Sequence, residues 1–180
     1  MADFDFEKLI VDIPDYPKPG VIFKDITPIL GDPEALAAAI DAFAEHFADA
    51  GITKIVGAEA RGFIFGAALA YKMGVGFVPA RKPGKLPRET VGVDYVDEYA
   101  TNRVEMHTDS LDASDKVLIV DDLIATGGTA TACSRLIKHF GAEVAGYAFL
   151  LELCFFKPRE IIANQDGDVE VFTLVQVDGE

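Results

Sequence analysis

The sequence is poor in positive charge. Against 30 aspartate and glutamate residues it has 16 lysine and arginine residues, so its formal net charge is −14. A chain with so much negative charge repels other polyanions, and we therefore expect no nucleic-acid partner. The simplest use of this charge is solubility, which is how we interpret it.

Cysteine, histidine and long hydrophobic runs are also scarce. Cys133 and Cys154 lie far apart without C-x-x-C or metal-ligand spacing, so we expect reduced core residues in a reducing compartment. The three histidines, His46, His107 and His139, are scattered in the same way, and we expect them on the surface. No hydrophobic run reaches membrane-spanning length, and no targeting pattern opens the chain. We therefore predict a cytoplasmic protein without a membrane partner.

Two common phosphate-binding patterns are missing. The sequence has no G-x-x-x-x-G-K-[ST], which argues against a P-loop kinase or NTPase. The segment Gly74-Val-Gly-Phe-Val-Pro is not a dinucleotide fingerprint, because no helix follows it. With 180 residues, half of them hydrophobic, the chain can bury a full core but is too short for two ordinary catalytic domains. We predict one domain over residues 1–180.

The most informative stretch runs from Val117 to Ala130. Its first four residues are aliphatic and mostly β-branched, which predicts a strand buried on both faces. Asp121 and Asp122 follow directly, at the carboxyl end of that strand, where open α/β sheets bind ligands. The turn Thr126-Gly-Gly-Thr129 then has little side-chain bulk, so its backbone N–H groups can surround an anion just before a helix.

Two carboxylates repel the anion that the turn would attract, so the acids and the turn must bind different parts of one ligand. We therefore expect a phosphate on the turn and neutral hydroxyls or a metal ion on the acids, and a sugar phosphate offers both. The alternative is a buried strand that ends in a polar loop, with Thr and Gly serving only as caps and turn residues. That alternative leaves two adjacent carboxylates at a sheet edge without a purpose.

Three further segments carry candidate binding residues. Phe23 lies in a short apolar segment bounded by Pro and Gly, and it either packs in a loop or offers its face to a planar ring. Arg61 is a cation at a strand-to-helix turn, where the helix dipole disfavours it unless an anion binds there. The segment from Arg81 to Arg88 has four cations in eight residues, which in so acidic a chain favours a patch for a polyanion over a solvated loop.

Periodicity predicts an α/β order of elements with a mainly parallel central sheet flanked by helices. Thr90 to Met106 alternates in two stretches and predicts two short strands that form a mobile flap. The predicted helices are Phe6–Ile13, one capped by Asp32 and closed by Gly51, Phe63–Met73 and Ala130–Phe140. The other predicted strands are Ile52–Val56, Val75–Pro79, Val117–Val120, Val144–Leu151 and Val169–Val177.

The motif from Val117 to Ala130 resembles the phosphoribosyl pyrophosphate signature of the type I phosphoribosyltransferases, and nearly the whole chain resembles their adenine-specific members. The resemblance implies that Ala125, Thr126, Gly127, Gly128 and Thr129 bind the 5′-phosphate. It assigns Ile22, Phe23 and Lys24 to adenine, with the Lys24 side chain not required, and Arg61, Arg81, Lys82 and Lys85 to the diphosphate. Residues 1–30 would form an N-terminal helix and a base-binding hood, and residues 81–107 the basic loop and flap.

The flap pair Glu98-Tyr99 resembles the Glu-Tyr of the same family, whose Glu acts at the purine ring. Here Ala100 replaces the Gly that usually follows. The implied catalytic residues are Glu98, Asp121 and Asp122, with Tyr99 at the substrate.

The resemblance implies a purine-salvage enzyme that makes AMP and pyrophosphate from adenine and phosphoribosyl pyrophosphate. It also implies Mg²⁺ held mainly through the sugar diphosphate, with no direct protein ligand, and a homodimer. Two alternatives remain from the sequence: a phosphoribosyltransferase for hypoxanthine, guanine or xanthine, and a non-catalytic regulator that binds phosphoribosyl pyrophosphate.

Overall fold

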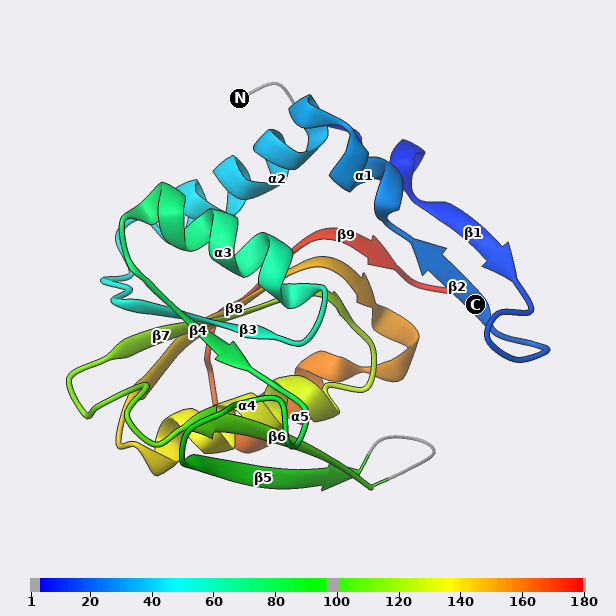
Figure 1. The fold of residues 1–180 in the computed structure, drawn as a ribbon. Helices are drawn as coiled ribbons and strands as arrows, with labels where there is room; N and C mark the ends of the chain where they lie inside the picture. The colour runs from blue at the N-terminus through cyan, green and yellow to red at the C-terminus, as the bar shows by residue number, and fades with distance from the viewer. Residues whose placement is uncertain (1–3, 97–100, 180) are drawn as a thin grey trace.

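A five-stranded parallel sheet forms the centre of the structure, a computed structural model that describes residues 4–96 and 101–179 (Figure 1). The strand order is β4-β3-β7-β8-β9, and every neighbouring pair is parallel. The expected α/β architecture is thus confirmed. The strands are β3 (Lys54–Ala58), β4 (Gly76–Ala80), β7 (Lys116–Ile124), β8 (Glu143–Leu153) and β9 (Val171–Val177).

Helices cover both faces of this sheet, α2 and α3 on one face and α4 and α5 on the other (Figure 1). In α2 the predicted cap is confirmed, because the Asp32 carboxylate accepts hydrogen bonds from the backbone N–H groups of Glu34 and Ala35. The helix ends at His46, before Gly51, and short turns follow. The four helices are α2 (Pro33–His46), α3 (Gly62–Met73), α4 (Gly128–His139) and α5 (Pro158–Asp166).

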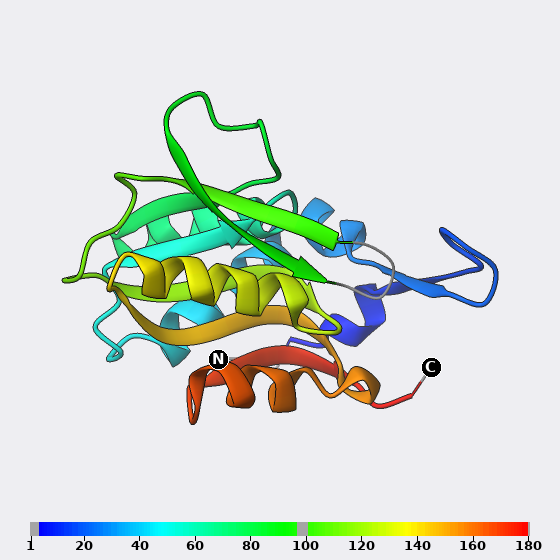
Figure 2. The ribbon, with the colours of Figure 1, turned by 90° about the horizontal axis from the view of Figure 1, so that it is seen from below.

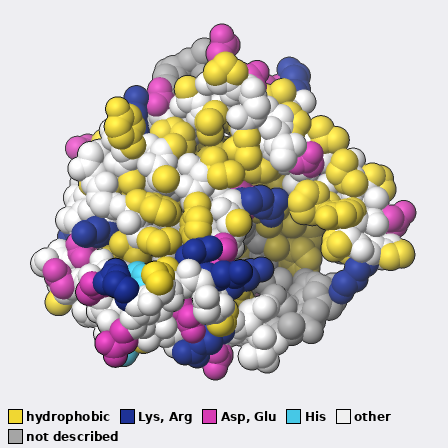
Figure 3. Space-filling view, viewed as in Figure 1, with side chains coloured by type: hydrophobic (Ala, Val, Ile, Leu, Met, Phe, Trp, Pro, Cys, Tyr) yellow, Lys and Arg dark blue, Asp and Glu magenta, His cyan; other side chains and the backbone are white. Residues whose placement is uncertain are grey.

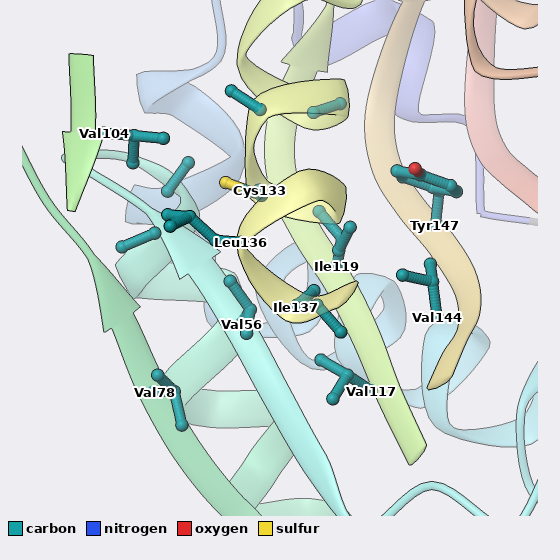
Figure 4. Packing of buried hydrophobic residues seen from close by; sticks show 14 of the residues in the cluster. Val56, Val78, Val104, Val117, Ile119, Cys133, Leu136, Ile137, Val144 and Tyr147 are labelled. Atoms are coloured by element: carbon teal, nitrogen blue, oxygen red, sulfur yellow. The ribbon is translucent and has the colours of Figure 1, made fainter. Parts of the chain in front are cut away.

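Strand β7 is buried on both faces because its residues alternate between two cores. Val117 and Ile119 belong to the cluster on the α4 side, where Leu136 packs against the sheet (Figure 4). Leu118 and Val120 belong to the cluster on the side of α2 and α3. A continuous aliphatic run is what such a strand requires.

Two antiparallel pairs lie outside the central sheet. Strands β5 (Thr90–Val96) and β6 (Thr101–His107) pair with each other, which confirms the two predicted flap strands. Strands β1 (Val11–Pro14) and β2 (Ile22–Asp25) form a hairpin that projects from the body of the molecule (Figure 2). We call this hairpin the hood.

The structure of the hood and of its neighbouring segments differs from two predictions. The predicted helix over Phe6–Ile13 is wrong: a short 3₁₀ helix, η1 (Phe6–Leu9), is followed at once by β1. Pairing of Ile13 with Phe23 replaces the helical register, and the strand's own Pro14 could not continue a helix. The segment after Gly20 is not a plain loop either, because it contains β2 and the one-turn helix α1 (Thr27–Gly31).

Helix α5 was not anticipated. It follows a single 3₁₀ turn, η2 (Cys154–Phe156), and begins at Pro158. Only Pro158 and Ile162 of the helix are buried, so its sequence carries no clear apolar stripe. Ile162 belongs to the core cluster on the α4 side of the sheet, so tertiary packing and not a local pattern stabilises this helix.

None of the helices in the described parts of the chain is long and apolar enough to cross a membrane.

Candidate active site

The site lies where the chain changes direction across the sheet. From β3 the chain enters α3 on one face, whereas from β7 it enters α4 on the other. The two strands are neighbours, and their last paired residues are Gly57 and Val120. Such a switch point opens a crevice at the carboxyl ends of the strands, which is where α/β proteins bind ligands.

The two acids stand at this crevice, although not after the end of their strand as predicted. Strand β7 continues to Ile124 by pairing with β8, so Asp121 and Asp122 lie within it, just beyond its last partner in β3. Asp122 is buried, and Asp121 is half-buried. Asp121 Oδ1 accepts a hydrogen bond of 2.9 Å from the Asp122 N–H.

The acid pair is electrostatically strained. Burial, reinforced by the neighbouring Asp122 carboxylate, raises the pKa of Asp121 well above its ordinary 3.8. A site that concentrates negative charge in this way is suited to a partner that donates hydrogen bonds or carries positive charge.

Arg61 connects the acid pair to the hood. Its Nε lies 2.8 Å from Asp122 Oδ2, and its guanidinium carbon lies 5.4 Å from the centre of the Phe23 ring. The next residue permits this approach, since a β-carbon on Gly62 would stand 2.7 Å from the Val120 carbonyl oxygen and 2.9 Å from Asp121 Oδ1. The structure thus brings Phe23, Arg61 and Asp122 together from segments far apart in the sequence.

The glycine-rich turn opens a cavity beside the acids. Gly127 has φ +79°, a left-handed conformation that favours glycine, and it is the residue before the first turn of α4. The cavity has a volume of about 190 Å³, and Asp121 lies on its wall together with Ala125, Thr126, Gly127, Gly128 and Thr129. A turn of this shape at a helix N-terminus suits an anion.

The basic loop contacts an acid, Glu59, that the sequence analysis did not single out. Glu59 accepts bonds of 3.2 and 2.8 Å from Arg81 Nε and Nη2, and a third of 3.0 Å from the Lys82 N–H. These bonds, the Arg81 pair first, hold the pKa of Glu59 below its ordinary value. Arg81 also donates to the carbonyl of Lys85.

Glu59 could have been found from the strand order. Ala58 and Ala80 are paired at the ends of β3 and β4, so the next residues, Glu59 and Arg81, must be neighbours. Lys82 and Lys85 are exposed, so their charges face solvent. Figure 3 shows Lys and Arg side chains gathered beside a hollow that hydrophobic side chains border.

The hood places the three predicted base-binding residues on one strand, β2. Phe23 is half-buried, and its ring edge meets Tyr16 with a centroid distance of 5.3 Å. Ile22 is exposed. The Lys24 ammonium lies 2.7 Å from Asp12 Oδ1 on the facing strand, a partner that the sequence analysis missed.

Glu98, Tyr99 and the neighbouring Ala100 lie outside the described residues, so their roles stay predictions. Of the other predicted site residues, Phe23, Arg61 and Asp122 meet directly, and Asp121 shares a cavity wall with the turn from Ala125 to Thr129. No hydrogen bond or ion pair in the described parts of the chain joins Ile22, Lys24, Lys82 or Lys85 to that group.

The chain is similar to known proteins over most of its length. A family model for the phosphoribosyl transferase domain matches residues 26–180. The adenine phosphoribosyltransferase of Solidesulfovibrio magneticus is 59% identical over 156 residues, which are 87% of this chain and 91% of that protein. This chain belongs to the adenine phosphoribosyltransferase family.

Solved structures of adenine phosphoribosyltransferases have the same fold. The enzyme of Giardia lamblia, complexed with 9-deazaadenine, matches with a TM-score of 0.91 and 36% identity over 99% of each chain. That of Trypanosoma brucei, in complex with AMP, pyrophosphate and ribose-5-phosphate, matches with a TM-score of 0.87 and 29% identity over 95% of this chain and 78% of the other. The family and fold that the sequence resembled are confirmed.

Proposed function

We propose that this protein transfers the phosphoribosyl group of phosphoribosyl pyrophosphate to adenine and so makes AMP and pyrophosphate in purine salvage. The observation that carries the proposal is the crevice at the switch point between β3 and β7. There Arg61 lies between the buried Asp122 and the ring of Phe23, and Asp121 shares the wall of a cavity with the glycine-rich turn. The named activities of the relatives support the same reaction.

The acids would act on the ribose. As the bond from ribose C1 to the pyrophosphate oxygen breaks, positive charge builds on the sugar, and the bonding electrons leave with pyrophosphate. Asp121 and Asp122 would accept hydrogen bonds from the ribose hydroxyls and place negative charge next to that cation. Their burial makes this charge effective, because little water screens it.

The turn from Ala125 to Thr129 would hold the 5′-phosphate and fix the position of the sugar. Arg61, Arg81, Lys82 and Lys85 would take the charge of the leaving group. For Arg61 and Arg81, this role requires exchanging an existing carboxylate partner, Asp122 or Glu59, for the diphosphate.

Mg²⁺ would help to neutralise the diphosphate. The described residues contain no group of three or more His, Cys, Asp or Glu side chains that could hold a metal ion. Magnesium is commonly bound through substrate phosphates and water, and we propose that the ion is held mainly through the sugar diphosphate.

The hood and flap would serve the base. The Phe23 ring would stack on adenine, while backbone groups of Ile22 and Lys24 read its edge. Glu98 would handle a proton on the purine as another ring nitrogen attacks C1, with Tyr99 nearby. The flap would exclude water that could otherwise hydrolyse the sugar diphosphate.

We also propose a cytoplasmic homodimer in which the basic loop reaches the diphosphate partly across the subunit interface. Two features support a partner surface. Lys82 and Lys85 are exposed, and α3 carries the exposed apolar side chains of Ile64 and Tyr71. The two free cysteines are consistent with a reducing compartment. Light scattering after gel filtration tests the dimer, and a monomeric mass would contradict it.

A substrate panel tests the function. Adenine, hypoxanthine, guanine and xanthine are each offered with phosphoribosyl pyrophosphate, with and without Mg²⁺. We expect turnover of adenine that depends on Mg²⁺ and far slower turnover of the other bases. Faster turnover of another purine would replace adenine in the proposal, and binding of phosphoribosyl pyrophosphate without turnover of any base would favour the regulator.

A further inference from the structure

In the described part of the flap, the side chain of Tyr95 contacts the glycine-rich turn. The Thr129 hydroxyl donates a hydrogen bond of 3.2 Å to the Tyr95 hydroxyl. A β-carbon on Gly128 would lie 3.3 Å from Tyr95 Cδ2 and 3.4 Å from the Val96 carbonyl oxygen. The tyrosine ring therefore packs directly on the backbone of the turn, and any larger residue at position 128 would crowd it.

Strand β5 is held in this place by the body of the molecule. The Arg135 Nη2 of α4 donates a bond of 3.0 Å to the Asp94 carbonyl oxygen, one residue before Tyr95. Val91, Val93 and Tyr95 pack, partly buried, against the core on the α4 side. The position of the Tyr95 hydroxyl next to Thr129 is thus set by contacts on both sides of it.

The hydroxyls of Tyr95 and Thr129 can form a chain of hydrogen bonds that ends at an anion. Each can donate and accept, and each proton rotates about its C–O bond. A phosphate dianion only accepts hydrogen bonds. When the Thr129 hydroxyl donates to it, the Thr129 oxygen can accept a hydrogen bond from the Tyr95 hydroxyl. Hydroxyls in such a chain polarise one another, which strengthens the bond to the anion.

We propose that Tyr95 is a positioning residue for the 5′-phosphate: it orients the Thr129 hydroxyl toward the anion and ties the flap to the occupied turn. The proposal rests on the proposed assignment of the turn to the 5′-phosphate. It gives the flap a role in holding the sugar, in addition to its roles at the base and in excluding water.

The variant Tyr95→Phe tests this, because it keeps the ring over Gly128 and removes only the hydroxyl. Affinities are measured by calorimetry for two ligands with a 5′-phosphate, ribose 5-phosphate and AMP, and for pyrophosphate, which lacks one. We expect ribose 5-phosphate and AMP to bind about 2- to 10-fold more weakly, the usual effect of losing one hydrogen bond. Pyrophosphate should bind as in the parent.

Three variants serve as controls. Ser114→Ala removes an exposed hydroxyl just before the amino end of β7, at the opposite end of that strand from the acid pair, and it should change no affinity. Thr129→Val removes the other hydroxyl, and adding Tyr95→Phe to it should cost nothing more if both act through one bond. Thr129→Ser keeps the hydroxyl and should respond to Tyr95→Phe as the parent does.

Equal weakening of all three ligands would overturn the proposal, because it would mean that the flap is merely loosened. Unchanged affinity for ribose 5-phosphate, or additive effects of Tyr95→Phe and Thr129→Val, would also overturn it. A parent protein that does not bind ribose 5-phosphate would refute both the turn assignment and the role of Tyr95. The proposed function is judged separately, by turnover of adenine in the parent.

Discussion

Strand β7 and the hood border the same crevice but are held in opposite ways. The four residues of β7 directly before the acid pair, Val117 to Val120, are all buried between two layers of helices. In the hood, every residue of β1 is exposed, and the hairpin pairs with no strand of the central sheet. An isolated two-stranded hairpin is only marginally stable.

This difference separates two tasks of the proposed enzyme. The sugar phosphate would bind to groups that the core fixes before the ligand arrives, which favours catalysis by charges already in place. The base would bind to a hairpin held by a few local contacts, such as the pair of Lys24 with Asp12 and the bond from the Gly20 N–H to Asp15. Substitutions in the two regions should therefore differ in kind as well as in size.

The largest loss of kcat is expected from a substitution in the flap, because Glu98 is the proposed proton-transfer residue. Glu98→Gln keeps the size of the side chain but removes its titratable group, so kcat should fall by about 10²- to 10⁴-fold. Binding of phosphoribosyl pyrophosphate should persist. The matched control is Glu89→Gln, an exposed residue just before β5. Turnover within about threefold of the parent, or an equal loss in the control, would reject the role of Glu98.

In the rigid centre, Asp122→Asn should lower kcat by about 10²- to 10³-fold, a loss typical of removing one preorganised electrostatic group. The substitution preserves volume, so circular dichroism should show an unchanged fold. Loss of the charge also removes the ion pair with Arg61 and the second cause of the raised Asp121 pKa. Parent-like turnover in a folded variant would refute the assignment.

Asp121→Asn should lower kcat and raise the stability of the folded protein at neutral pH. Because the pKa of Asp121 is raised, the folded state binds its proton more tightly than the unfolded state does. The parent must therefore lose stability as the pH rises above the ordinary carboxyl value of 3.8. The variant lacks that titration, so its melting temperature should exceed the parent's at neutral pH, while kcat falls at least about tenfold. A variant less stable than the parent at neutral pH would show that the charge is not strained.

Phe23→Ala probes the hood. Loss of a stacking contact worth about 0.5–1.5 kcal/mol should raise the KM for adenine by about 2- to 10-fold. The KM for phosphoribosyl pyrophosphate, measured on the same variant, is the internal control and should hardly change. If both constants rise alike, Phe23 belongs to the packing of the hood and not to the base site.

The smallest effect is expected from Asp12→Asn, which breaks the pair that joins β1 to β2. Partly exposed ion pairs contribute about 0–1 kcal/mol, so the KM for adenine should rise by no more than about fivefold. High salt should raise the KM of the parent toward that of the variant. The control is Asp5→Asn, which breaks the equally short pair with Lys8 outside the hood. If kcat changed more than the KM for adenine, a role of Asp12 confined to the hood would be contradicted.

The sequence by itself determined the buried central strand and its glycine-rich turn. The continuous aliphatic run from Val117 to Val120 favours a strand that is buried between two apolar layers. Gly127 has a left-handed backbone conformation that few other residues adopt. These are local demands, so they can be read from a few adjacent residues. The strands of the flap were predicted for the same reason, from alternation within one segment.

Only the tertiary structure decided which distant residues meet. The bond of Glu59 to Arg81 follows from the parallel pairing of β3 with β4, and the contact of Thr129 with Tyr95 from the packing of β5 on α4. The apolar spacing from Phe6 to Ile13 suited a helix, yet pairing with β2 made its second half a strand. A short segment has too few contacts of its own to fix its conformation, so its partner in space decides it.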